Sequence, residues 1–276
     1  MPTVTVDALV DAPCPRVGVT ITGLGVGDSV VTVWRIADEE RNPVRGARRA
    51  VMNDANYVVD FDAPLGRPIT YEVEVISGPS GPSRTSAASV TVESATGWIM
   101  DPLVPRTAVP VVGGEGNEAY LRPAALASLE YAANVQLYEI MGSNKPMALF
   151  GQRMAESNLD TSMGTDSAIQ NARLKKLLRS TAQLLFRPHP SWGQFEMAGT
   201  MFLANAKATQ IPVNTQWGGE CTWWDIKSDV VEAPAIKVLT STFSYGDVKI
   251  LMSTYQQKQD LMAGKTYLED LKNPIG

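Results

Sequence analysis

Histidine and cysteine are nearly absent from this 276-residue chain, which has one histidine and two cysteines. Cys14 and Cys221 lie far apart and neither belongs to a Cys-x-x-Cys pair, so the sequence predicts neither a disulfide framework nor a zinc site. His189 alone cannot build a multi-histidine metal site. No apolar run approaches the roughly 20 residues that span a bilayer. The N-terminus also lacks a basic region ahead of an apolar stretch. We therefore expect a soluble protein without a signal peptide, a metal or another cofactor.

An excess of positive charge is also missing. Lysine and arginine total 24 and aspartate and glutamate 29, which gives a net charge of −5. This balance argues against wrapping nucleic acid, which needs a basic surface. One basic cluster, Arg41, Arg45, Arg48 and Arg49, is interpreted as a solvated loop rather than as a surface for an acidic partner. Apolar residues make up 44% of the chain, so a sizeable core is expected. At about 150 residues per domain, the length suggests two domains.

The first 95 residues alternate between apolar and polar positions in short runs, which is typical of half-buried strands. The clearest run is 69–75, and shorter ones lie at 17–21, 31–36, 57–61 and 90–92. The intervening turns, such as GLGVGD, are rich in glycine, proline and aspartate. Gly23-x-Gly25-x-Gly27 is interpreted as a β-turn and not as a phosphate-binding loop, because a strand follows it and not a helix. Six or seven strands in this length predict a β-sandwich.

The run Tyr71-Glu72-Val73-Glu74-Val75 resembles the Tyr-x-Val-x-Val strand of fibronectin type III modules. In those modules the tyrosine hydrogen-bonds back to the preceding loop, and the resemblance gives Tyr71 that role. It implies a fibronectin type III or Ig-like sandwich over residues 1–95, with Trp34 and Tyr71 largely buried. Sandwich domains of this kind usually serve as binding modules or spacers and seldom as enzymes.

Residues 96–241 predict a mixed antiparallel α+β domain. Two prolines in the segment 98–105 favour extended backbone there. One helix is expected over 167–182, with Ser167 and Gln170 as a capping box and an apolar stripe of Ile169, Leu174, Leu177 and Leu178. Strands are expected at 135–140, 147–154, 183–187, 195–203 and 221–231. Residues 119–131 are ambiguous, although their alanines suggest helix.

Residues 242–276 carry a repeated pattern of a hydroxyl residue, tyrosine, any residue, then an acid or amide. The copies begin at Ser244, Thr254 and Thr266. Each copy is a capping-box signature, so each is expected to start a short helix. Helices this short are marginal alone, and we expect their tyrosines to pack on the body of the protein or on an adjacent subunit. The candidate assembly interface is Tyr245, Val248, Leu251, Tyr255, Tyr267 and Leu271.

The chain as a whole resembles minor tail proteins of siphophages that infect actinobacteria. The resemblance is carried by the junction Trp98-Ile-Met-Asp101-Pro102-Leu103-x-Pro105, by Thr222-Trp223-Trp224-Asp225-Ile226 leading to Glu232-Ala233-Pro234, and by the terminal repeats, where tyrosine replaces the tryptophan that is common in the family. It implies a distal tail or tip-ring protein, located in the virion, that forms a ring, commonly hexameric. The middle domain would build this ring between the tail tube and the baseplate. The implied partners are other copies of the chain, the tail tube, the tape measure and the hub or baseplate proteins; no catalytic residues are implied.

Two other functions remain as alternatives. Trp192, Trp217, Trp223 and Trp224 could stack on host glycans in a carbohydrate-binding adhesion module. We favour instead that Trp223 and Trp224 point to opposite faces of a strand, one in the core and one at a subunit interface. An enzyme acting on cell-wall polymer would need paired carboxylates or a Ser-His-Asp site around His189, and neither is marked by a motif. No active site is predicted.

Overall fold

The computed structural model describes residues 2–87, 89–113, 118–123, 125–128, 130–139, 141, 144–195, 197–213, 221–235, 248–249, 252 and 254–272. The fold is mainly β with a few short helices, as predicted. The chain divides into two compact units. The first combines Met1–Ala108, Arg187–Thr200 and Pro234–Gly276, and the second combines Val109–Phe186 and Met201–Ala233. The units therefore do not follow the predicted order of three consecutive domains, because two later segments return to the first unit.

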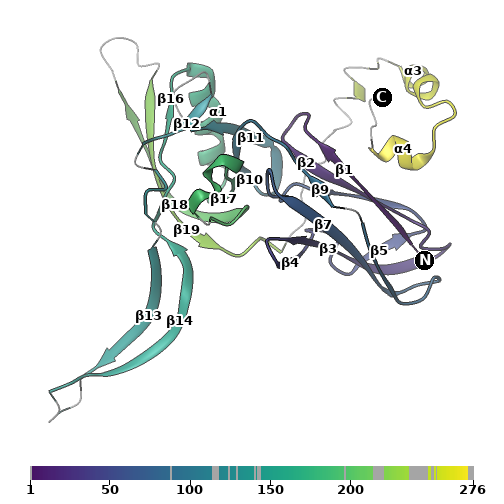
Figure 1. Cartoon of the computed structure of the whole chain (residues 1–276). Coiled ribbons are helices and arrows are strands. Elements are labelled where there is room, and N and C mark those ends of the chain that lie inside the picture. The colour runs from purple at the N-terminus through teal and green to yellow at the C-terminus, as the bar shows by residue number, and fades with distance from the viewer. Residues whose placement is uncertain are drawn as a thin grey trace. The chain divides into compact units, whose positions relative to one another are not determined.

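Two antiparallel sheets form most of the first unit (Figure 1). One has the order β1-β2-β6, and the other has the order β4-β3-β7-β8, with β5 paired to β3 and β9 to β7. Their bounds are β1 Thr3–Leu9, β2 Arg16–Thr22, β3 Asp28–Ala37, β4 Glu40–Pro43, β5 Ala50–Asn53, β6 Asn56–Asp60, β7 Pro68–Ser77, β8 Ser83–Ser86 and β9 Val90–Thr91. The glycine-rich segment before β3 is a turn that leads directly into this strand, as expected.

The alternation read from the sequence appears as alternating burial. In β7, Ile69, Tyr71, Val73 and Val75 are buried, whereas the residues between them are partly exposed. They share one apolar cluster with buried residues of β2 and β3, so both sheets contribute to a single core. This burial supplies the main stabilisation of the unit.

Trp34 differs from its prediction, because it is half-buried rather than largely buried. Its side chain lies on the outer side of the second sheet. Its indole N–H donates to Glu74 at 2.8 Å, and the Arg41 guanidinium stacks 3.9 Å from the centre of its ring. A cation–π contact and a charge-assisted hydrogen bond thus stabilise Trp34 on the outer side of the sheet, although it was expected to pack in the core.

An eight-stranded sheet has the order β15-β19-β16-β12-β11-β10-β17-β18. Because β18 also pairs with β19, seven of these strands close into a barrel-like ring. Their bounds are β10 Gly97–Asp101, β11 Val104–Val112, β12 Ala119–Leu121, β15 Leu159–Asp160, β16 Met163–Thr165, β17 Gln183–Arg187, β18 Met201–Pro212 and β19 Thr222–Val231. The strands predicted at 183–187 and 221–231 are confirmed, and the segment 98–105 is extended except for a turn at 102–103. The strand predicted at 195–203 was wrong over most of its length, because β18 begins only at Met201 and Phe195 ends the 3-10 helix η1 (Pro190–Phe195). In the ambiguous region 119–131, Ala119–Leu121 is strand.

Helix α1 (Ala168–Ser180) confirms the helix expected over 167–182. Ser167 caps it by accepting from the backbone N–H of Ile169 at 3.3 Å. The reciprocal half of the predicted capping box is replaced, because the Gln170 side chain donates to Glu118 instead. Leu174 and Leu177 are buried as predicted, whereas Ile169 is 67% exposed and lies off the packed face.

Strands β13 (Glu130–Tyr138) and β14 (Met147–Ser157) form a separate two-stranded sheet. They confirm most of the strands predicted at 135–140 and 147–154: β13 begins five residues earlier than predicted and ends at Tyr138, and β14 continues to Ser157. Figure 1 shows them as a long hairpin that projects from the rest of the second unit. The C-terminal region contains α3 (Tyr255–Leu261) and α4 (Tyr267–Lys272). The first tyrosine repeat, 244–247, lies outside the described residues.

Candidate functional site

The β13–β14 hairpin exposes an unusual number of large apolar side chains. In the paired register Val135 lies opposite Phe150, and Tyr138 lies opposite Met147. Phe150 is 80% exposed. The other exposed members are Tyr131, Val135, Leu137, Tyr138, Met141, Met147 and Leu149. A contiguous exposed apolar patch of this kind usually marks a site of interaction with another molecule.

These side chains occupy both faces of the hairpin. Directly paired residues share a face and successive residues alternate, so Val135, Leu137 and Phe150 lie on one face. Tyr138, Met147 and Leu149 lie on the other face. A two-stranded hairpin is marginal in water without a surface to pack on. Each such side chain contributes roughly 1.5–3 kcal/mol when it is buried, so a partner covering both faces would stabilise the hairpin substantially.

The C-terminal helices form as the sequence predicts. Thr254 and Gln257 make a complete capping box at the start of α3, and Thr266 with Glu269 makes the same reciprocal pair before α4. The prediction that the tyrosines pack on the chain's own body was wrong, because Tyr255 and Tyr267 are 82% and 81% exposed. Packing on an adjacent subunit stays a prediction.

The other members of the candidate interface are divided between exposed, partly buried and undescribed positions. Leu271 is 45% exposed, and Val248 is partly buried. Tyr245 and Leu251 lie outside the described residues. Helix α4 lies near β6, and the Lys272 ammonium is 5.7 Å from the centre of the Tyr57 ring. Helix α4 thus contacts β6 on one side, and its Tyr267 and Leu271 remain exposed.

A buried charge network in the first unit was missed at the sequence level. The Arg35 guanidinium donates to both carboxylate oxygens of Asp60 at 3.0 Å, and the Tyr71 hydroxyl donates to the same carboxylate at 2.9 Å. Beside it, Arg45 donates to both oxygens of Asp62 at 2.5 and 2.6 Å. Burial alone would raise the pKa of Asp60, but Arg35 and the hydrogen bonds from Asp62 and Tyr71 together lower it.

This network corrects two interpretations. Arg45 pairs inside the protein and Arg41 pairs with Glu72, so neither belongs to a freely solvated loop; Arg48 and Arg49 are exposed as expected. Tyr71 does hydrogen-bond backward along the chain. Its acceptor is a carboxylate at the end of β6, eleven residues upstream, and not loop backbone.

Arg187 is also completely buried. Its Nη1 donates to the backbone carbonyl of Pro15 at 2.5 Å. Its Nε and Nη2 have no hydrogen-bond partner among the described residues. Burial lowers its pKa, and the carboxylates of Asp60 and Asp62 oppose that effect. The arginine ties the segment 187–200 to the first strands of the chain.

His189 lies in a local turn. Its Nδ1 is 2.6 Å from the Ser191 hydroxyl and accepts from the Ser191 backbone N–H at 3.0 Å. The pair lies at the surface, two residues apart, and no described carboxylate hydrogen-bonds to it. Such a turn fixes a side chain locally but does not present an aligned nucleophile, base and orienting acid. Among the residues that the structure describes, no group of three or more His, Cys, Asp or Glu side chains could hold a metal ion.

Trp223 and Trp224 point to opposite faces of their strand as predicted, and the placement of one of them at a subunit interface stays a prediction. Trp224 is buried and its indole N–H donates to Asn171 at 3.0 Å. Trp223 is 38% exposed, with the Arg122 guanidinium 4.7 Å from its ring centre. The adjacent residues therefore point to opposite faces of β19. Trp192 is half-buried, and Trp217 lies outside the described residues.

No family model matches the chain, and no curated protein or solved structure matches it either. The resemblance to phage minor tail proteins therefore rests on the sequence motifs alone. None of the described helices is both long and apolar enough to cross a membrane.

Proposed function

We propose that this protein is a structural subunit of a bacteriophage tail tip, which assembles with copies of itself into a ring and joins the tail tube to the baseplate. The observation that carries the proposal is the β13–β14 hairpin, whose two faces both expose large apolar side chains. A free hairpin gains little from such a surface, whereas an assembly subunit can bury both faces against its neighbours. The tail-tip setting, the hexameric stoichiometry and the other tail partners come from the family resemblance.

A fibronectin type III-like β-sandwich in the first unit is part of the same proposal. The sheet orders β1-β2-β6 and β4-β3-β7-β8 and the shared core support it. The buried Tyr71, which donates a hydrogen bond back along the chain to Asp60, also supports it. A sandwich of this kind serves as a spacer or decoration on the ring.

The hairpin can be tested face by face. Phe150→Ser alters one face and Leu149→Ser alters the other, and Val26→Ser is the matched control because Val26 is 89% exposed in the first unit. Sedimentation velocity and rotational averaging of electron micrographs would measure assembly. We expect symmetric rings from the wild type and the control, and smaller species from both hairpin variants. A wild-type chain that stays monomeric up to its solubility limit, alone and with the tail proteins, contradicts the proposal.

The C-terminal helices provide a second test. Because Tyr255 and Tyr267 are exposed on the chain itself, we expect the substitutions Tyr255→Ser and Tyr267→Ser to leave the protein folded and to weaken assembly. Deletion of residues 242–276 should likewise leave a folded monomer. A deletion variant that still forms rings of wild-type stability would remove these helices from the interface.

A further inference from the structure

The sheet of the second unit carries a small apolar patch where β18 ends and β19 begins. Ile211 lies opposite Trp223 in the paired register, and the backbone N–H of Val213 donates to the carbonyl of Cys221 at 3.1 Å. Directly paired residues share a face, as do residues two positions apart in one strand, so these four side chains lie on the same face. Ile211, Val213 and Trp223 are 41%, 47% and 38% exposed, and together they form the Trp223 patch.

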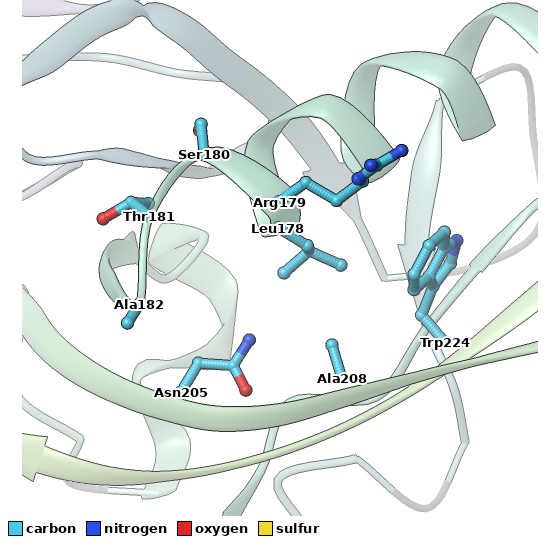
Figure 2. A pocket seen from close by; sticks show the side chains of 8 residues that line it. All are labelled: Leu178, Arg179, Ser180, Thr181, Ala182, Asn205, Ala208 and Trp224. Atoms are coloured by element: carbon cyan, nitrogen blue, oxygen red, sulfur yellow. The ribbon is translucent and has the colours of Figure 1, made fainter.

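The Trp223 patch faces away from α1. Trp224, the next residue of β19, is buried on the opposite face, where it lines a pocket with Leu178 and Ala208 (Figure 2). On the outer face, the Arg122 guanidinium stacks 4.7 Å from the centre of the Trp223 ring, which stays partly exposed. Tryptophan and arginine are enriched at the energetically important centres of protein interfaces. The patch therefore has the composition of an interface centre.

The β13–β14 hairpin leaves the same sheet at its other end. The backbone N–H of Asn158, directly after β14, donates to Asp229 at 2.8 Å. Asp229 follows Trp223 by six positions in β19, which is roughly 20 Å along a strand. Figure 1 shows the hairpin projecting away from the end of β18 and the start of β19. A hairpin with this direction does not reach the patch of its own chain, so the two surfaces meet only between molecules.

One face of the hairpin matches the patch in both polarity and charge. It presents Val135, Leu137 and Phe150, and aromatic and aliphatic side chains of this kind pack well on a tryptophan ring. Glu139 is exposed and follows directly after β13. Within the described part of the chain, neither Glu139 nor Arg122 takes part in an ion pair. A carboxylate on the hairpin and a guanidinium on the patch are complementary.

We propose that the hairpin of one copy docks on the Trp223 patch of the next copy, with its Phe150 face against Trp223 and its Glu139 carboxylate beside Arg122. The contact is heterologous, because each copy contributes a hairpin from one end of its sheet and a patch from the other. Repeated around an axis, contacts of this kind close into a ring. The inference rests on the assembly role proposed above and names the surface that receives the hairpin.

Substitutions in the patch test the receiving surface. Trp223→Ser and Ile211→Ser should each reduce assembly as strongly as Phe150→Ser does, as measured by sedimentation velocity. Val231→Ser is the matched control, because Val231 lies on the same face of β19 at its far end and is 36% exposed. It should assemble like the wild type. Thermal melting would establish that each variant is folded.

An exchange of charges tests the orientation of the contact. Arg122→Glu and Glu139→Arg should each raise the protein concentration that assembly requires, by about two- to fivefold. The double variant carries the same pair in reverse, so it should assemble like the wild type. Damage to the fold would not be repaired in this way, because the double variant contains both substitutions. If the double variant does not recover, the proposed orientation is wrong.

Cysteine crosslinking locates the contact directly. Cys221 is exposed beside the patch, whereas Cys14 is buried. Ala148→Cys adds a thiol on the Phe150 face of the hairpin, so a short bismaleimide should join copies into a ladder of dimers, trimers and larger species. Gln136→Cys, on the opposite face of the hairpin, is the matched control and should give far less of this ladder. Combining Ala148→Cys with Cys221→Ser should abolish it.

The results separate this inference from the assembly role on which it rests. If wild-type rings form and both Trp223→Ser and Ile211→Ser assemble equally well, the hairpin docks elsewhere, although the assembly role stands. If the variant with Ala148→Cys and Cys221→Ser crosslinks efficiently into dimers, hairpins of two copies pack on each other and the inference is wrong. A wild-type chain that stays monomeric contradicts the assembly role and the inference together.

Discussion

Replacing Asp60 by asparagine should destabilise the first unit more than any other single isosteric change in its charge network. Asp60 is buried, and its two carboxylate oxygens accept from the Arg35 Nη1 and one of them also from the Tyr71 hydroxyl. Asp60→Asn keeps the shape but leaves the Arg35 guanidinium, 11% exposed, without its counter-charge. Breaking a buried ion pair from one side costs about 3–5 kcal/mol. The nearby Asp62 carboxylate partly compensates Arg35, so we expect about 3 kcal/mol, at the lower end of that range.

Tyr71→Phe is the matched variant. It removes only the hydroxyl that donates to Asp60, so it should cost about 1.5–2 kcal/mol, as for a hydrogen bond to a charged group. Hydrogen exchange read by mass spectrometry would measure local opening in β3 and β7, with β18 and β19 of the second unit as the internal reference. If Asp60→Asn costs no more than Tyr71→Phe, the network does not stabilise the unit as an ion pair.

The same pair gives a pH dependence of definite sign. The pKa of Asp60 is lowered in the folded protein, so the unfolded chain binds a proton first as the solution is acidified. The contribution of Asp60 is complete above about pH 4, the ordinary range of an aspartate, and is lost as the pH falls through the lowered pKa. Asp60→Asn should therefore show a shallower loss of stability at acid pH than the wild type. Equal acid sensitivity in both proteins would refute this assignment.

Three further predictions concern packing and capping. Gly18→Ala would place a Cβ 2.2 Å from the hydroxyl oxygen of Tyr57, so it should cost about 1–3 kcal/mol by urea denaturation, and the additional change Tyr57→Ala should relieve part of that cost. Thr254→Ala should raise exchange in α3 by the loss of its capping box, worth about 0.5–2 kcal/mol; unchanged exchange would show that the cap is dispensable. Leu174→Ala, at a fully buried position of α1, should cost about 2–5 kcal/mol in thermal unfolding, and a smaller loss would mean that the site collapses around the deletion.

Local patterns in the sequence were sufficient to predict most of the strands and the helix caps. The alternation over 69–75 places Tyr71 and Val73 in the core because a strand has a period of two. The pattern at Thr254 requires only residues three positions apart, so the capping box was predictable. The same local reasoning failed at Trp34, whose exposure depends on Arg41 and Glu74 in neighbouring strands.

Long-range contacts were beyond the reach of the sequence pattern. The arginines of the buried network lie 17 and 25 residues from their aspartates, and no periodicity joins positions so far apart. The sequence predicted the strands of the hairpin but gave no sign that both of its faces would stay exposed on the chain itself.

The discontinuity of the first unit bears on how the protein is made. Residues 187–200 return to the unit that the first 108 residues begin: Arg187 bonds to Pro15, Arg67 bonds to Met197 at 3.0 Å, and Thr200 bonds to Asp62 at 2.8 Å. During synthesis the early strands can pair, but the unit stays incomplete at least until the chain through residue 200 has emerged, and Pro234–Gly276 joins it later still. Domains usually fold on the ribosome in order of their synthesis, and here that order is interrupted by the whole stretch from Val109 to Phe186. A fragment cut at residue 95 would therefore correspond to a nascent intermediate and not to a finished domain.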